Sequence, residues 1–324
     1  MGRNHRRRHE GASPRSHRIP ADEVLQLNTE FYGSLAVDEL SYQLLMNLLM
    51  LEPREELLHL LTTNSPTGAD LHVRALAIDS EKLRSAAALG VLVVSQHIAE
   101  TLLRLLYVHA CEDECTWVAL AELRERDVVH KIARDISLNR ITTPRARLDL
   151  EDVVLKYLVS GRDIPDRERA AFGPSAKWGV EWVRYAAGLA TGSQLYNSYK
   201  HGLTLSYRPP LPIGFAVEGT SYDDSMDTSF TYLRRPVGEE AARCACVQDF
   251  EPVDVSQRGV AALVLLHLLG NTVFIGARAR GVPSSVESIQ TYPVSFTPES
   301  VARKRESPVI LEYAPREFGS PRGR

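Results

Sequence analysis

One stretch of the sequence combines side chains that could act on a phosphate ester. Residues 194–202 read QLYNSYKHG, so Asn197, Lys200 and His201 lie close together and Gly202 follows at once. Asn197 and His201 are four residues apart and therefore share one face of a helix. A histidine in the last turn of a helix is favoured as its cation by the helix dipole, and it can act as a general acid or base. The stretch therefore predicts a site in which His201 moves a proton beside amide and ammonium donors.

The same residues also have a purely structural interpretation. A histidine in the last turn of a helix can cap free carbonyl groups, and Asn197 can satisfy buried backbone groups. The residues alone leave both interpretations open.

A second polar group interrupts a helix that is otherwise apolar on almost every side. Glu100 and Arg104 are four residues apart on the helix expected at 81–109. A charged pair on such a helix must be paired or face a cavity. If the helices bring these residues opposite Asn197 and His201, they form one network that orients His201 or fixes helix register, and we favour the second role.

The four cysteines form two close pairs, Cys111 with Cys115 and Cys244 with Cys246, and His109 lies beside the first pair. Neither spacing matches the usual four-ligand zinc patterns. In a strand, Cys244 and Cys246 point to the same face, as core residues would. The sequence contains no Gly-rich phosphate loop, HExxH or GxSxG. We therefore predict packing roles for the cysteines, with no metal and no other cofactor.

Composition limits the class of protein. The chain has 324 residues, of which 44% are hydrophobic and 24% charged, and its net charge is −3. It can bury a core, and it lacks the strong charge imbalance of a bulk nucleic-acid or membrane-surface binder. The apolar runs at 86–94 and 260–269 are shorter than the ~20 residues of a membrane span. No apolar run follows the six arginines of residues 1–20, so we expect no signal peptide, no membrane contact and a cytoplasmic protein.

Apolar periodicity and turn residues predict a mainly α-helical fold. We expect four core helices at about 35–51, 81–109, 176–201 and 255–278, and shorter helices at 55–61, 116–137 and 149–159. Residues 162–173 should be a surface connection, with the third core helix opening after Pro174. Gly188 and Gly192 in that helix suggest that a neighbouring helix crosses closely. Strands at 213–218, 229–234 and 243–250 would form a small β-hairpin insertion at about 205–250.

The expected domain organisation is simple. Residues 1–20 should be a disordered basic tail, a candidate to touch nucleic acid although a solvated terminus is the commoner role. Residues 21–296 should form a single helical domain. Residues 297–324 contain four prolines and should be a loose C-terminal tail.

A helical bundle with a late Asn-x-x-x-His at a helix end resembles the HEPN superfamily. Its nucleases carry Arg-Asn-x-x-x-His, and this chain has Tyr196, Asn197 and His201 at those positions. The resemblance implies a homodimer formed through the bundle helices, and RNA as substrate for metal-independent cleavage in defence or stress response. Tyr196 cannot supply the permanent cation of the missing arginine. The resemblance therefore favours a non-catalytic or degenerate binding or dimerisation module, and the alternative is an endoribonuclease that uses His201 as general acid or base.

Overall fold

The computed structural model describes the chain in several separate segments. They are residues 19–34, 37–51, 80–123, 128–192, 255–284, 286 and 297–301, and the backbone of five short strands between 205 and 252. The predicted basic tail up to residue 18, the predicted helix 55–61, and residues Cys244 and Cys246 lie outside them.

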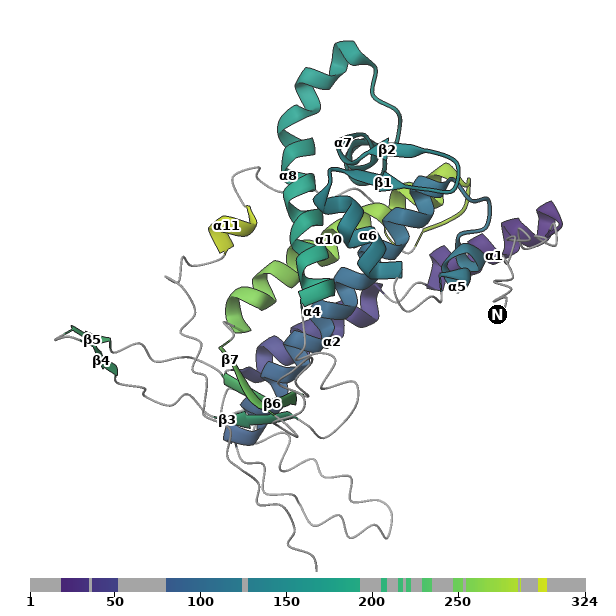
Figure 1. The fold of residues 1–324 in the computed structure, drawn as a ribbon. Coiled ribbons are helices and arrows are strands. Elements are labelled where there is room, and N and C mark those ends of the chain that lie inside the picture. The colour runs from purple at the N-terminus through teal and green to yellow at the C-terminus, as the bar shows by residue number, and fades with distance from the viewer. Residues whose placement is uncertain are drawn as a thin grey trace, which may run out of the picture.

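The fold is mainly α-helical with small β elements, as the sequence predicts (Figure 1). The longer helices are α1 (Ala21–Ser34), α2 (Val37–Leu51), α4 (Ser80–Cys111), α6 (Val128–Ser137), α8 (Asp166–Gly192) and α10 (Val255–Ala279). Shorter ones are α5 (Thr116–Glu122), α7 (Leu150–Val154), the π-helix η1 (Leu155–Ser160) and α11 (Pro298–Val301). The four predicted core helices correspond to α2, α4, α8 and α10.

Helix α4 lies at the centre of the bundle. It packs against α2, α8 and α10 and also contacts α5, α6 and η1. Its residues Ile98, Leu102 and Leu106 are completely buried. An all-round apolar helix can be stable in water only when neighbours cover every side. The enclosure of α4 therefore determines where the other helices lie.

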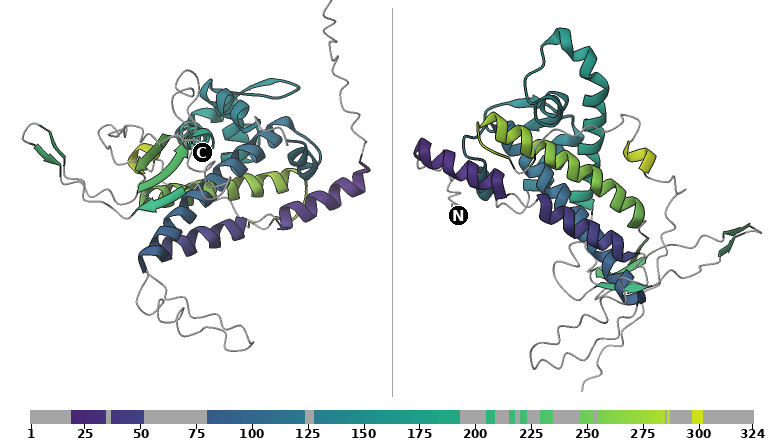
Figure 2. Two further views of the ribbon diagram at one scale, coloured as in Figure 1. Left: turned by 60° about the horizontal axis from the view of Figure 1, so that its bottom comes forward. Right: turned by 180° about the vertical axis from the view of Figure 1, so that it is seen from behind.

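Helices α1 and α2 run nearly end to end along one outer side of the bundle (Figure 2). The inner side of α2 contacts α4 and α10, and Leu44 on that side is fully buried. Helix α1 contacts α5 and α10. The sequence did not predict α1, because residues 21–34 combine weak apolar periodicity with several charged and polar residues.

The β elements are small and antiparallel. Strands β1 (Arg140–Thr142) and β2 (Arg147–Asp149) form a hairpin between α6 and α7 that the sequence did not predict. Strands β3 (Leu205–Arg208), β6 (Ser229–Arg234) and β7 (Val247–Pro252) form one sheet in the order β3-β6-β7. Strands β4 (Phe215–Val217) and β5 (Thr220–Tyr222) form a separate hairpin, so the predicted strands 213–218 and 229–234 are not partners.

Two helix boundaries differ from the prediction. Helix α8 begins at Asp166 and continues through Pro174, where a surface connection was expected. Arg169 in this first part forms ion pairs with Asp152 and Asp166. Acidic residues in the first turn also stabilise the helix, because they lie at the positive end of its dipole. The predicted helix 116–137 is two helices, because α5 ends at Leu123, whose backbone N–H bonds back to Ala119 and Leu120.

Close helix contacts lie at other glycines than those predicted, and Gly276 is one of them. A Cβ added at Gly188 or Gly192 would meet nothing within 4 Å among the described residues. At Gly276 of α10, a Cβ would overlap the ring of His109 and lie 2.7 Å from the Tyr32 hydroxyl. The missing side chain at Gly276 therefore makes room for the His109 imidazole of α4. The sequence pattern of α10 does not show which residue of another helix lies against a glycine.

Helices α4 and α10 are long and apolar enough to cross a membrane by length and composition. More than half of each apolar window is buried inside the protein, as in core helices of a soluble protein. The cytoplasmic location and the domain limits at residues 20 and 296 stay predictions.

Candidate functional site

The predicted catalytic stretch lies outside the described residues. Helix α8 is described as far as Gly192, so nothing follows here about Tyr196, Asn197, Lys200 or His201. The two supporting residues, Glu100 and Arg104, are described, and both are half-buried on α4.

Arg104 binds the end of a neighbouring helix. Its Nη1 donates to the carbonyl oxygen of Leu123 at 3.3 Å, and Leu123 is the residue that caps the C-terminus of α5. A cation at this position complements the negative end of a helix dipole. Within the described segments Arg104 makes no ion pair with Glu100, so their spacing on one helix did not produce the pair. The predicted network with Asn197 and His201 stays a prediction.

Arg104 also lines a cavity of about 190 Å³, together with Phe31, Thr101, Leu105 and Leu120. Its Nε is buried and has no hydrogen-bond partner among the described residues. Arg104 therefore faces a cavity, which is one of the two arrangements that the sequence predicts for a charged residue on this helix.

A buried polar centre joins α1, α4 and α5. The Tyr32 hydroxyl lies 2.8 Å from Nε2 of His109 and 2.8 Å from the hydroxyl of Thr116. All three side chains are almost completely buried. Burial lowers the pKa of His109, and the nearby Arg280 guanidinium lowers it further. The imidazole is therefore neutral at pH 7, and it lacks the solvent access that an acid or base catalyst needs.

Two further side chains complete this centre from α1 and α10. Asn28 donates to the carbonyl of Glu114 at 2.7 Å and accepts from the backbone N–H of Thr116 at 3.0 Å, so it caps the start of α5. Arg280 donates to the carbonyl oxygens of Gly276 and Asp113 and lies over the ring of Tyr32, 5.8 Å from its centroid. The centre therefore fixes α1 to the rest of the bundle.

The cysteine pair that is described belongs to the packed interior. Cys111 and Cys115 are buried and free, and burial raises the pKa of the Cys111 thiol to about 11. His109, which neighbours them in sequence, has Nε2 engaged by Tyr32. No group of three or more metal-binding side chains occurs in the described part of the chain.

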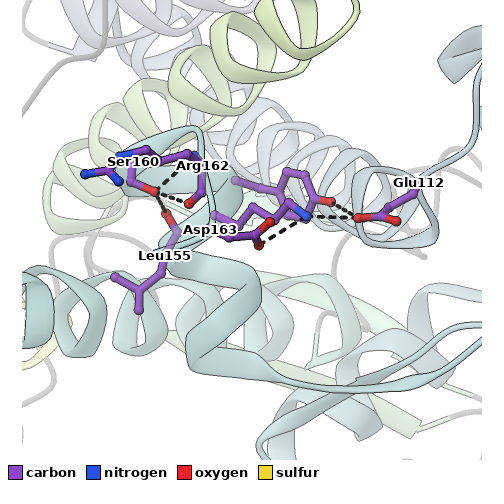
Figure 3. A network of polar contacts seen from close by, with 7 residues as sticks. Glu112, Leu155, Ser160, Arg162 and Asp163 are labelled. Atoms are coloured by element: carbon purple, nitrogen blue, oxygen red, sulfur yellow. Dashed lines mark hydrogen bonds and ion pairs between the residues drawn. The ribbon is translucent and has the colours of Figure 1, made fainter. Parts of the chain in front are cut away.

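An open polar cleft of about 230 Å³ lies beside the π-helix η1. Figure 3 shows the polar contacts there: Lys156 bridges Glu112 at 2.9 Å and Asp163 at 3.2 Å, and Tyr157 donates to the same Glu112 carboxylate at 3.4 Å. The Ser160 hydroxyl lies within hydrogen-bond distance of the carbonyl oxygens of Leu155 and Arg162, and Gly161 ends η1 in the left-handed conformation at φ 71°. The sequence predicted a helix at 149–159 but gave no signal for a π-helix.

The charges in this cleft neutralise one another. The hydrogen bond from Lys156 lowers the pKa of Glu112. Burial alone would lower the pKa of Lys156, but its bonds to Glu112 and Asp163 outweigh burial and raise it. Both groups are thus held in their charged forms, whereas acid–base catalysis needs a pKa near the working pH. Lys156 and Glu112 therefore form an ion pair, and neither is suited to proton transfer near neutral pH.

The outer side of α2 carries a second apolar stripe, which we call the α2 stripe. It consists of Tyr42, Leu45, Met46 and Leu49, with 70%, 43%, 50% and 59% of their surface exposed. Their spacing of i, i+3, i+4 and i+7 places them on one helix face. Four large apolar side chains exposed together on one helix are typical of an interaction surface.

The two helices on this side of the bundle carry five exposed carboxylates, and we call them the acidic rim. They are Asp22, Glu23 and Glu30 on α1 and Asp38 and Glu39 on α2. No lysine, arginine or histidine occurs between residues 19 and 51. The α2 stripe is therefore accompanied by negative charge without a base in the same segment.

Sequence reasoning missed the α2 stripe although its spacing is visible. The expected core helix at 35–51 has one apolar series at Leu40, Leu44 and Leu48. The second series on the opposite side was not separated from the first, because a helix that is apolar on two sides resembles a buried helix. Only the bundle geometry shows which series faces solvent.

Comparisons with protein-family models, with curated proteins and with solved structures find no match to this chain. The geometry of the described residues and the motif at 194–202 are therefore the features that bear on the function of this chain.

We expect acidification to destabilise the fold through His109. Because its pKa is lowered in the folded state, the unfolded chain takes up the proton first as the pH falls below about 6.5. The stability that neutral His109 contributes above that pH is then lost progressively, by at most about 1.4 kcal/mol per pH unit. Urea unfolding between neutrality and about pH 5 should show a flatter pH dependence for His109→Gln than for the wild type. An unchanged slope in His109→Gln would contradict the assignment.

Proposed function

We propose that the protein is a HEPN-like, non-catalytic binding module that associates with a helical partner through the α2 stripe. The observation that carries this proposal is the exposure of Tyr42, Leu45, Met46 and Leu49 on one face of a helix whose other face is in the core. Exposed apolar side chains do not stabilise the isolated chain. A partner that covers them removes apolar surface from water, and this burial makes binding favourable.

The character of the stripe fits a docking surface. Tyrosine offers a large apolar area with a polar tip, and methionine adapts its shape to different partners. Two of the four methionines of the whole chain, Met46 and Met50, occur in α2. An amphipathic partner helix could lie along the stripe with its own apolar residues spaced in the same way.

The electrostatics of the cleft beside η1 support the non-catalytic half of the proposal. Lys156, Glu112 and Asp163 satisfy one another, and the pKa directions of Lys156 and Glu112 are opposite to those of a general base and a general acid. The buried His109 is likewise a structural group.

We expect substitution of the stripe to remove a partner without unfolding the protein. Tagged wild-type protein and the Leu45→Gln/Leu49→Gln variant would be purified from cells of the source organism. A control variant, Glu151→Gln/Glu181→Gln, is changed at exposed sites on α7 and α8 and is purified in the same way. Quantitative mass spectrometry should find a protein, or an untagged second copy, retained by the wild type and the control and lost from the stripe variant. Identical sets of bound proteins in all three samples would contradict the proposal.

Metal-independent RNA cleavage is the second candidate function, and the motif Asn197-x-x-x-His201 favours it. Because Tyr196 replaces the arginine of the family motif, we expect no His201-dependent cleavage when the purified protein is incubated with RNA in EDTA. The measurement compares the wild type with a folded His201→Ala variant. Cleavage that disappears in that variant would overturn the non-catalytic assignment and make Asn197 and Lys200 catalytic candidates.

A further inference from the structure

We propose that the partner of the α2 stripe is a cationic amphipathic helix of another protein. The inference rests on the proposed function and adds the chemical class of the partner. It is carried by the acidic rim, whose carboxylates make no ion pair within the described residues.

Two carboxylates of the rim are placed where a partner on the stripe would meet them. Asp38 precedes Tyr42 by four residues and Leu45 by seven, so it lies on the same helix face at the end of the stripe. Glu39 borders that face. Helix α1, which runs nearly end to end with α2, carries the other three exposed carboxylates of the rim (Figure 2).

The rim is not neutralised within the described part of the chain. The Glu30 and Glu39 carboxylates each accept a hydrogen bond from a glutamine of their own helix, Gln26 at 3.0 Å and Gln43 at 3.1 Å. A neutral amide leaves the negative charge in place. The ion pairs of the described segments lie elsewhere, and none of them involves a carboxylate of the rim.

The sign of this charge selects among occupants of an apolar face. Nucleic acid and anionic lipid surfaces are negative, so the rim would repel them. A second copy that docked through the same face would place its own acidic rim against this one. Its residues 19–51 contain no basic side chain that could neutralise the two rims. A helix with leucine-like residues on one side and lysine or arginine at its borders matches both the stripe and the rim, and opposite charges also speed association.

The test measures binding of two synthetic helical peptides that share one apolar face. One carries leucine and lysine and the other leucine and glutamate, and binding to the full-length protein is followed by fluorescence anisotropy at low and high salt. We expect the Leu/Lys peptide to bind at least about tenfold more tightly than the Leu/Glu peptide. Salt should weaken the Leu/Lys complex, because the rim is exposed.

Three variants separate the contributions of the stripe and the rim. Leu45→Gln/Leu49→Gln should weaken Leu/Lys binding about tenfold or more, because it removes the apolar contacts. Asp38→Asn/Glu39→Gln should weaken it and reduce its salt dependence. The control Glu151→Gln/Glu181→Gln removes the same charge from α7 and α8, including an acid in the first turn of a helix, and should bind as the wild type does.

Other outcomes overturn the inference in distinguishable ways. Equal, stripe-dependent binding of both peptides would overturn the cationic partner and leave the docking face standing. The site would also be overturned if Asp38→Asn/Glu39→Gln and the control Glu151→Gln/Glu181→Gln weakened Leu/Lys binding equally while the stripe variant did not weaken it. Such binding would be an unspecific attraction between opposite charges. Stripe-dependent self-association in sedimentation, without peptide binding, would identify a second copy as the partner. Neither peptide binding nor self-association through the stripe would overturn the proposed function together with the inference.

Discussion

The structure depends on the enclosure of α4, a helix that is apolar on almost every side. Water cannot solvate any long face of it, so α2, α8 and α10 must each cover one. This requirement sets the rotation of α2 about its own axis. Once Leu44 faces α4, the helical repeat of 3.6 residues turns Tyr42, Leu45, Met46 and Leu49 to the outside. The exposed stripe is thus a geometrical consequence of core packing combined with a sequence that is apolar on two sides.

The buried polar centre complements this apolar packing at one end of the bundle. The missing side chain at Gly276 leaves space for the ring of His109, and the Tyr32 hydroxyl bridges His109 and Thr116. A buried polar group without a partner costs about 1–3 kcal/mol, so these bonds strongly favour one arrangement of α1 and α5. Because α1 carries three carboxylates of the acidic rim, the centre also positions part of the proposed docking face.

Apolar periodicity was sufficient to predict the helical class and the four core helices, because burial of α2, α4, α8 and α10 follows directly from it. Features that depend on tertiary contacts were not predictable. The helical start of α8 depends on ion pairs of Arg169 with residues outside and inside the helix. Arg104 donates to the end of α5 and does not pair with Glu100. His109 forms a hydrogen bond with Tyr32, which is 77 residues away in the sequence. The site predicted at Asn197, Lys200 and His201 lies outside the described residues and stays a prediction.

The central claim is that α2 has one side committed to the core and another free for a partner. Comparing Leu44→Ala with Leu49→Ala tests it directly, since the two residues share a helix and a side-chain type. In urea unfolding at two protein concentrations, the account predicts that Leu44→Ala lowers the free energy of unfolding by about 2–5 kcal/mol. It predicts a change within about 0.5 kcal/mol for Leu49→Ala. A loss for Leu49→Ala as large as that for Leu44→Ala at both concentrations would contradict the account, because the stripe would then belong to the core.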